Sequence, residues 1–288
     1  MGTSTAFGGG KNSNPLIPSW LEPELIDETT TPKNDDTSTD QSDLSQVASE
    51  TIVSNPQPSV LPVDNRYSTA RRNFTAFINS GGSDRAALGR AIVSYIHKTT
   101  GGAKQAAKRM KSERQASVRL GNILSMASVN GIQSVIKNLN LENLANRPIA
   151  EIYAALIDVI CPMGGDLDDS IVRDAYIEAV GEVAELGLAD LEQPSTATIA
   201  TIMECFISNT IKDRIMNAIA TKIIILPNNI LIVQDIENQL KDFIRGAVSD
   251  AMTNSSFFSA GQTSRTINSI FERSFAILEA LAEHEAEQ

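Results

Sequence analysis

Histidine, cysteine and tryptophan are nearly absent from this chain. Its 288 residues include two histidines, two cysteines and one tryptophan, and aromatic residues make up 5%. So few imidazoles exclude most histidine-based catalytic sets, and His97 has no carboxylate or cysteine at ligand spacing. Cys161 and Cys205 stand in apolar surroundings without a partner at metal-ligand or redox spacing. We therefore expect two buried thiols, no metal site and no cofactor.

Signals for membranes and export are also missing. The longest apolar run, residues 223–233, is too short to span a bilayer and is interrupted by Pro227. The first residues lack the basic and apolar regions of a secretion signal, and Ala6 stands where a myristoylation signal needs Ser or Thr. These absences predict a soluble, cytoplasmic protein.

No motif in the chain has the spacing of an active site. Residues 8–11, GGGK, lack the preceding strand, the GxxxxGK spacing and the Ser or Thr of a phosphate-binding loop. The run 164–169, GGDLDD, could hold a divalent cation, but acids at a helix N-terminus explain it without metal. Gly101 and Gly102, before a basic helix, form either an anion site or a turn. We expect that the chain is not an enzyme.

Charge is distributed very unevenly. Residues 1–65 carry 2 Lys or Arg against 10 Asp or Glu, residues 66–122 carry 12 against 2, and residues 123–288 carry 10 against 23. One helix is expected from Ala103 towards Met126, on which Lys104, Lys108 and Lys111 would form a stripe at i, i+4 and i+7. Such a surface suits an acidic protein, an acidic segment of this chain, nucleic-acid phosphates or solvent alone. The lack of interleaved aromatic residues and of a DNA-binding motif favours contact with a protein or with the chain itself. The predicted basic patch consists of Arg71, Arg72, Lys104, Lys108, Arg109 and Lys111.

The first 65 residues read as an acidic tail. Thr, Ser, Asp, Asn and Pro dominate residues 22–65, and isolated apolar residues there cannot offset roughly 1–2 kcal/mol of backbone entropy per residue. We therefore expect disorder. The exception is residues 15–21, PLIPSWL, a compact apolar cluster that follows a glycine-loosened start and contains the only tryptophan. It is either a docking motif or a segment that folds back on the chain's own core.

From Arg66 onwards, apolar residues recur at helical spacing. Expected helix starts are Ser83, Pro148, Asp168 or Asp169, Pro194 and about Thr263, and breaks are expected at residues 80–82 and 100–102. Residues 223–233 fit either a β-hairpin or two helices, the second capped by Asn228 or Asn229, and their helical flanks favour helices. The fold class is all-α: a helical bundle-like domain preceded by a long disordered N-terminal tail. We expect three segments: the tail (1–65), a basic helical segment (66–126) and an acidic all-helical core (127–288).

Several stretches together resemble a known family. They are MGTS at the start, PLIPSWL, the acidic Ser/Thr/Pro linker, residues 80–110 (SGGSDRAALGRAIVSYIHKTTGGAKQAAKRM) and residues 239–248 (QLKDFIRGAV). In order and layout they are similar to the QatB family of the Qat anti-phage defence operons. The resemblance implies three partners: an ATPase (QatA), an enzyme similar to QueC of deazaguanine biosynthesis (QatC) and a TatD-like metal-dependent nuclease (QatD). Catalysis would belong to these partners, and this chain would be an adaptor or a substrate.

The resemblance also gives the N-terminus a possible chemical role. Removal of Met1 would leave the amine of Gly2, and an α-amino group titrates near 7.7–8.0 against about 10.4 for lysine. QueC-like enzymes use ATP to activate a deazaguanine carboxylate for attack by ammonia, and the Gly2 amine could replace that ammonia. Partner-binding residues would then be Pro15, Leu16, Ile17, Pro18, Trp20 and Leu21. The alternative is a nucleic-acid-binding subunit that presents DNA to the TatD-like nuclease through its basic helices.

Overall fold

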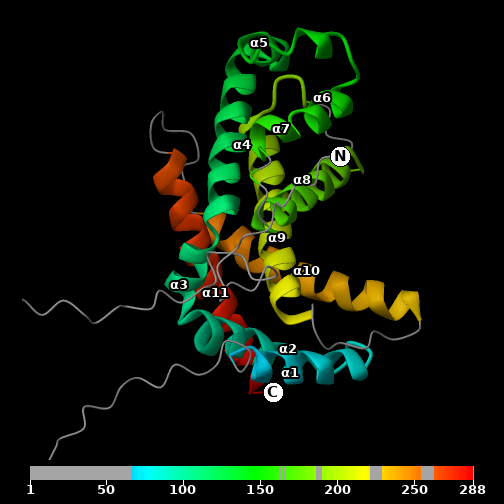
Figure 1. Cartoon of the computed structure of the whole chain (residues 1–288), viewed down its shortest axis with the longest axis vertical. Coiled ribbons are helices and arrows are strands. Elements are labelled where there is room, and N and C mark those ends of the chain that lie inside the picture. Colours follow the sequence, from blue (N-terminus) through cyan, green and yellow to red (C-terminus); the bar gives the residue numbers. More distant parts are fainter. Residues whose placement is uncertain are drawn as a thin grey trace, which may run out of the picture. The chain divides into compact units, whose positions relative to one another are not determined.

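The described part of the chain is built from helices. The computed structural model describes residues 66–162, 164, 167–185, 190–220, 229–253 and 263–287, and no strand occurs among them. The all-α prediction is therefore confirmed (Figure 1). The expected disorder of residues 1–65 concerns residues outside this description. The helices are α1 (Ser68–Asn79), α2 (Arg85–Ser94), a π-helix (Tyr95–Thr100), α3 (Ala103–Arg109), α4 (Lys111–Asn130), α5 (Ile132–Asn138), a 3₁₀ turn (Glu142–Leu144), α6 (Ile149–Ala155), α7 (Ile157–Ile160), α8 (Leu167–Glu185), α9 (Thr196–Ala220), α10 (Ile230–Met252) and α11 (Thr263–Ala286).

Side-chain caps fix several helix starts. Asp84, rather than the predicted Ser83, caps α2, because its carboxylate accepts from the amide of Ala87 at 2.8 Å while the Ser83 hydroxyl donates to the carbonyl of Ser80. Asn229 caps α10 through the amide of Leu231 at 3.0 Å. Because residues 230–233 belong to α10, the hairpin alternative is excluded for them, whereas residues 223–228 lie outside the described part.

One helix break follows a glycine, and two others occur at buried residues. Gly101 lies in the left-handed region with φ of 89°, where glycine is favoured, and separates the π-helix from α3. The single helix expected after Pro148 is instead two, α6 and α7, which meet at buried Leu156. The single helix expected from Ala103 to Met126 is also wrong. It is interrupted at Met110, whose ψ of 57° is not helical and whose side chain is buried.

The core is shared by helices from both sides of residue 126, the boundary that we predict between the basic and acidic segments. α9 packs against α8, α10 and α4, and α11 packs most extensively against α2 while also contacting α10, α3 and α4 (Figure 1). Tyr176 of α8 meets Phe206 of α9 edge on, with ring centroids 5.9 Å apart, and donates its hydroxyl to the carbonyl of Tyr153 in α6. These contacts place the basic helices α3 and α4 on the same apolar core as the later helices.

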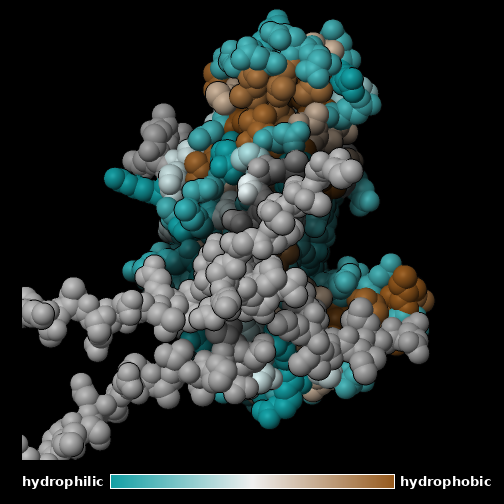
Figure 2. Space-filling model, viewed as in Figure 1, coloured by the Kyte–Doolittle hydropathy of each residue, from teal (hydrophilic) through white to brown (hydrophobic). Residues whose placement is uncertain are grey.

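Large apolar side chains are exposed at several places on the described surface. Ile230 and Leu231 at the start of α10 are 70% and 68% exposed. Figure 2 shows hydrophobic surface at this end of α10 and again near α6 and α7. An apolar pocket between α6 and α8 is lined in part by Ala150 and Val180. Leu167, which is 66% exposed, lines a pocket together with Arg109 of α3, so exposed apolar surface also lies beside the predicted basic patch.

Candidate functional site

The predicted docking and modification residues cannot be placed. Gly2 and the cluster Pro15, Leu16, Ile17, Pro18, Trp20 and Leu21 lie outside the described residues. Their roles stay predictions.

The predicted basic patch is distributed over three helices. In α1, Arg71 is turned inward: its guanidinium lies 5.0 Å from the ring centre of Tyr67 and donates to the carbonyl of Ala218 at 3.2 Å. Its neighbour Arg72 is exposed. Lys104, Lys108 and Arg109 are exposed on α3, and Lys111 is the exposed first residue of α4. The break at Met110 means that Lys111 does not continue a stripe on the helix of Lys104 and Lys108.

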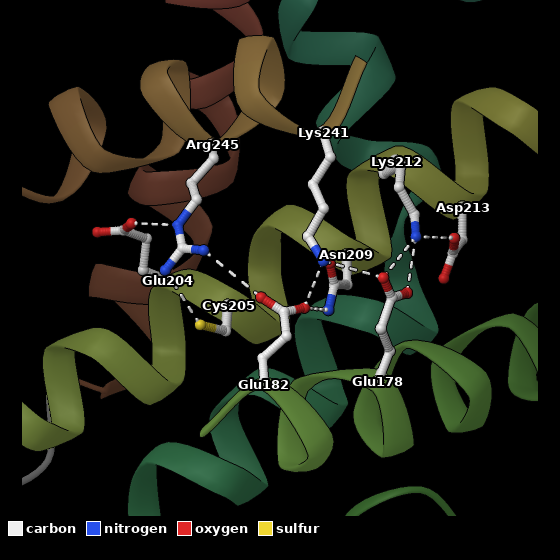
Figure 3. A network of polar contacts seen from close by, with 9 residues as sticks. All are labelled: Glu178, Glu182, Glu204, Cys205, Asn209, Lys212, Asp213, Lys241 and Arg245. Carbon is white, nitrogen blue, oxygen red and sulfur yellow. Dashed lines mark hydrogen bonds and ion pairs between the residues drawn. The ribbon is translucent and has the colours of Figure 1, made fainter. Parts of the chain in front are cut away.

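Most cations of the later helices are paired with carboxylates, and the clearest case joins α8, α9 and α10 (Figure 3). Lys241 Nζ lies 3.0 Å from Glu178 Oε1 and 2.7 Å from Glu182 Oε1, both on α8. Lys212 of α9 also contacts Glu178, at 2.7 Å. Lys241 therefore joins α10 to α8, and Lys212 joins α9 to α8.

The same network continues one turn further along α10. Arg245 Nε lies 2.9 Å from Glu204 Oε1 on α9, and its Nη1 lies 3.5 Å from Glu182 Oε2. Asn209 donates its side-chain amide to Glu182 at 2.7 Å. Lys241 and Arg245 both belong to the stretch 239–248 singled out in the sequence, and their spacing of four residues places them on one face of α10. That stretch thus supplies two interhelical ion-pair donors.

The pKa shifts in this network are those expected of ion pairs that hold α8, α9 and α10 together. Burial raises the pKa of Glu178, but hydrogen bonds from Lys212 and Lys241 outweigh it, so that this pKa lies below its usual value. Burial raises the pKa of Asp213 to about 6 despite nearby Lys212. Cys205 Sγ lies 3.3 Å from an Arg245 nitrogen, yet burial still raises its pKa to about 11. The Cys205 thiol therefore stays protonated at neutral pH, as an inert core thiol does.

A second buried charged cluster was not predicted from the sequence. Glu113 of α4 has no exposed surface, and its Oε1 lies 3.6 Å from Arg214 Nη1 of α9. The same Arg214 nitrogen bonds Asp168 at the start of α8, and Arg214 also donates to the carbonyl of Arg109. Burial raises the pKa of Glu113 to about 7, against the opposing effect of Arg214. Asp168 was predicted only as a helix start, and nothing in the local sequence shows that it meets Arg214.

The described residues form neither a metal-binding group nor a membrane-spanning helix. In the described ranges, no three His, Cys, Asp or Glu side chains are grouped so that they could hold a metal ion. Of the run 164–169, Asp168 binds Arg214 and Asp169 accepts from the amide of Gly164. Among these residues, no helix is long and apolar enough to cross a membrane.

These observations define an all-helical protein whose described helices are joined by interhelical ion pairs. Comparison with protein families then gives a more specific assignment. The model of the QatB family, described as Qat anti-phage system associated protein QatB, matches residues 101–278, more than half of the chain. The chain belongs to this family and is a component of the Qat anti-phage defence system, so other Qat components are its partners. No curated protein and no solved structure matches it.

Proposed function

We propose that the chain is a non-enzymatic adaptor and substrate subunit of the Qat defence complex. It docks through residues 15–21 on the QueC-like partner QatC and accepts a deazaguanine on the Gly2 amine. The observation that carries this proposal is the isolated PLIPSWL cluster, set in an acidic, polar segment that has little else to bury. Family membership supports the setting, because it makes the chain part of a multi-component system.

The described helices support a role without chemistry of their own. A nucleophile needs a lowered pKa or an adjacent base. Burial instead raises the pKa of Cys161 to about 12 and that of Cys205 to about 11, and it also raises the pKa values of Tyr95, Tyr153 and Tyr176. These groups are core side chains, which supports placing the reactive step on a partner.

The docking motif suits an extended peptide bound in a partner's groove. Trp20, Leu16 and Ile17 offer large apolar side chains that fill pockets, and such anchors carry most of the energy of an interface. Pro15 and Pro18 restrict the backbone, which lowers the entropy lost on binding. In this proposal residues 3–11, whose sequence has three consecutive glycines, supply the reach from the docking motif into the partner's active site.

The proposed modification is a condensation. QatC uses ATP to activate the deazaguanine carboxylate, the neutral Gly2 amine attacks the activated carbonyl carbon, and an amide bond forms as the leaving group departs with its electron pair. The amine loses one proton to solvent. At neutral pH roughly a tenth or more of an α-amine is neutral, against well under a thousandth of a lysine amine. The α-amine is therefore the favoured acceptor.

The test is the intact mass of the protein, purified alone and from cells that also make the other Qat components. We expect an added mass equal to the deazaguanine acid less one water, mapped to the N-terminal peptide and dependent on QatC. Gly2→Leu, which retains Met1, should lose the added mass and phage protection, whereas the matched control Lys11→Arg should keep both. Trp20→Ala should lower modification by weakening docking. An unchanged mass with QatC present, together with full protection by Gly2→Leu, refutes the proposal.

A further inference from the structure

A groove between α4 and the start of α11 differs in charge from the clusters above. Among the described residues, its lining contains three cations and no acidic side chain. Lys111, Gln115 and Ser264 are exposed, and Arg114 and Arg119 are partly buried. The polar residues that line it are Lys111, Arg114, Gln115, Arg119, Ser264 and Asn268.

The two arginines of this groove are held by neutral acceptors. Arg114 donates from Nε to the carbonyl of Met110 at 3.1 Å, from Nη1 to Asn268 Oδ1 at 2.6 Å and from Nη2 to the carbonyl of Lys108 at 3.2 Å. Arg119 donates from Nε to the carbonyl of Ile160 at 2.6 Å. Within the described ranges, neither forms an ion pair with a carboxylate, unlike Lys241 or Arg245. Both guanidinium groups are thus oriented without a carboxylate at ion-pair distance, and Arg114 acts on the neighbouring Glu113 carboxyl only as a weaker influence than Arg214.

Lys111 adds a third cation, which the helix itself does not favour. It is the first residue of α4, and the positive end of the helix dipole disfavours a cation there. In the described part of the chain, no carboxylate lies at ion-pair distance from it. The stability of α4 therefore does not explain its charge. From Lys111 to Arg119 the three cations extend roughly 12 Å along the helix at 1.5 Å per residue.

We propose that this α4–α11 groove binds the phosphate backbone of duplex nucleic acid. Lys and Arg side chains with neutral amides and a hydroxyl beside them are the groups that contact phosphate oxygens. An acidic protein fits less well, because protein interfaces depend on buried apolar anchors and Val118 is the only apolar side chain among the lining residues. A single strand also fits less well, because the described lining has no aromatic side chain on which bases stack.

This site is separate from the proposed docking of residues 15–21, and it differs from the predicted basic patch in using Arg114 and Arg119. Removal of residues 1–21 should therefore leave nucleic-acid binding unchanged. Failure of one proposal leaves the other standing.

The experiment measures binding of the full chain to a fluorescent 20-base-pair DNA duplex of arbitrary sequence at several salt concentrations. Three phosphate contacts predict a slope of about −2.7 in a plot of log affinity against log salt, or roughly a 40-fold loss between 50 and 200 mM. Lys111→Gln should reduce the slope to about −1.8 and the loss to roughly 12-fold. Lys137→Gln, an exposed lysine on α5, is the control with the same change in charge and should bind like wild type.

A substitution at Gln115 tests whether the charge of the groove, rather than a loss of folding, determines binding. Gln115→Glu changes an exposed groove residue to its acidic isostere, and the double variant Lys111→Gln/Gln115→Glu should abolish detectable duplex binding. Gln234→Glu on α10 is the matched control. Circular dichroism confirms that each variant folds. No duplex binding by wild type at 50 mM salt overturns the proposal, as does equal binding by groove and control variants. A groove that binds polyglutamate more tightly than duplex DNA overturns it in favour of an acidic protein partner.

Discussion

Glu113→Gln should remove a large pH dependence from the stability of this protein. The Glu113 carboxyl is fully buried, and its folded-state pKa is raised to about 7 from an ordinary value of 4.5. In the unfolded chain it ionises near its ordinary value. Between these two pH values the folded state holds a proton that the unfolded state does not, so stability falls as the pH rises.

The size of the effect follows from the two pKa values. One pKa unit corresponds to 1.36 kcal/mol, so the raised pKa of Glu113 costs about 3 kcal/mol of folding free energy once the pH exceeds 7. Below pH 4.5 this cost is absent. The substituted glutamine side chain carries no charge at any pH and still fills the same space, so the stability of Glu113→Gln relative to wild type should rise by about 3 kcal/mol from pH 4.5 to pH 8.

The assay is urea denaturation of the full chain, followed by circular dichroism at pH steps from 4.5 to 8. Comparing variant with wild type at each pH cancels other titrating groups, including Asp213, whose raised pKa acts in the same direction. Glu185→Gln, at an exposed position on α8, is the control, and its difference from wild type should stay constant. If the free energies of unfolding of Glu113→Gln and wild type differ by the same amount at every pH in this range, the Glu113 carboxyl does not cause the pH dependence.

Two further pairs of substitutions test the packing of α2 on α11 and the ion pairs of Lys241. Gly89→Ala should destabilise the fold by about 2 kcal/mol or more, because a Cβ there would lie 2.5 Å from the carbonyl oxygen of Ala282. Gly181→Ala, in open space on α8, should stabilise it by up to about 1 kcal/mol, and urea denaturation compares the two. Lys241→Met should cost about 1–3 kcal/mol, because Glu178 and Glu182 lose a shared donor, while exposed Lys137→Met should change little. Equal urea midpoints for Gly89→Ala and Gly181→Ala contradict the close packing at Gly89. Equal midpoints for Lys241→Met and Lys137→Met contradict a stabilising role of the Lys241 ion pairs.

Local patterns in the sequence predicted much of the fold. Apolar spacing and the breaks at residues 80–82 and 100–102 indicated helices, and α1, α2 and α11 begin or end within a few residues of the expected positions. Such signals are local, since a cap or a glycine acts within one turn. The interruption at Met110 carries no such signal. It arises because Met110 is buried in the core, and tertiary packing overrides helix propensity there.

The charged clusters could not be read from the sequence because their members are far apart in it. Lys241 and Glu178 are 63 residues apart, and Arg114 and Asn268 are 154 apart. Composition identified residues 66–122 as basic, but it could not tell which cations meet carboxylates. That distinction separates Arg214, paired with Asp168 and Glu113, from Arg114, which meets only neutral acceptors among the described residues.

The packing of α11 on α2 has a consequence for synthesis of the protein. α2 ends at Ser94 and α11 begins at Thr263, so at 5–20 residues per second the ribosome needs roughly ten to thirty seconds to supply the cover of α2. During that interval α2 lacks the helix that packs most extensively against it, including the close approach of Ala282 to Gly89. A nascent chain stalled before α11 therefore displays an apolar face that chaperones and proteases bind. Completion of the packing around α2 therefore waits on translation of α11, and unfinished copies are exposed to cellular quality control.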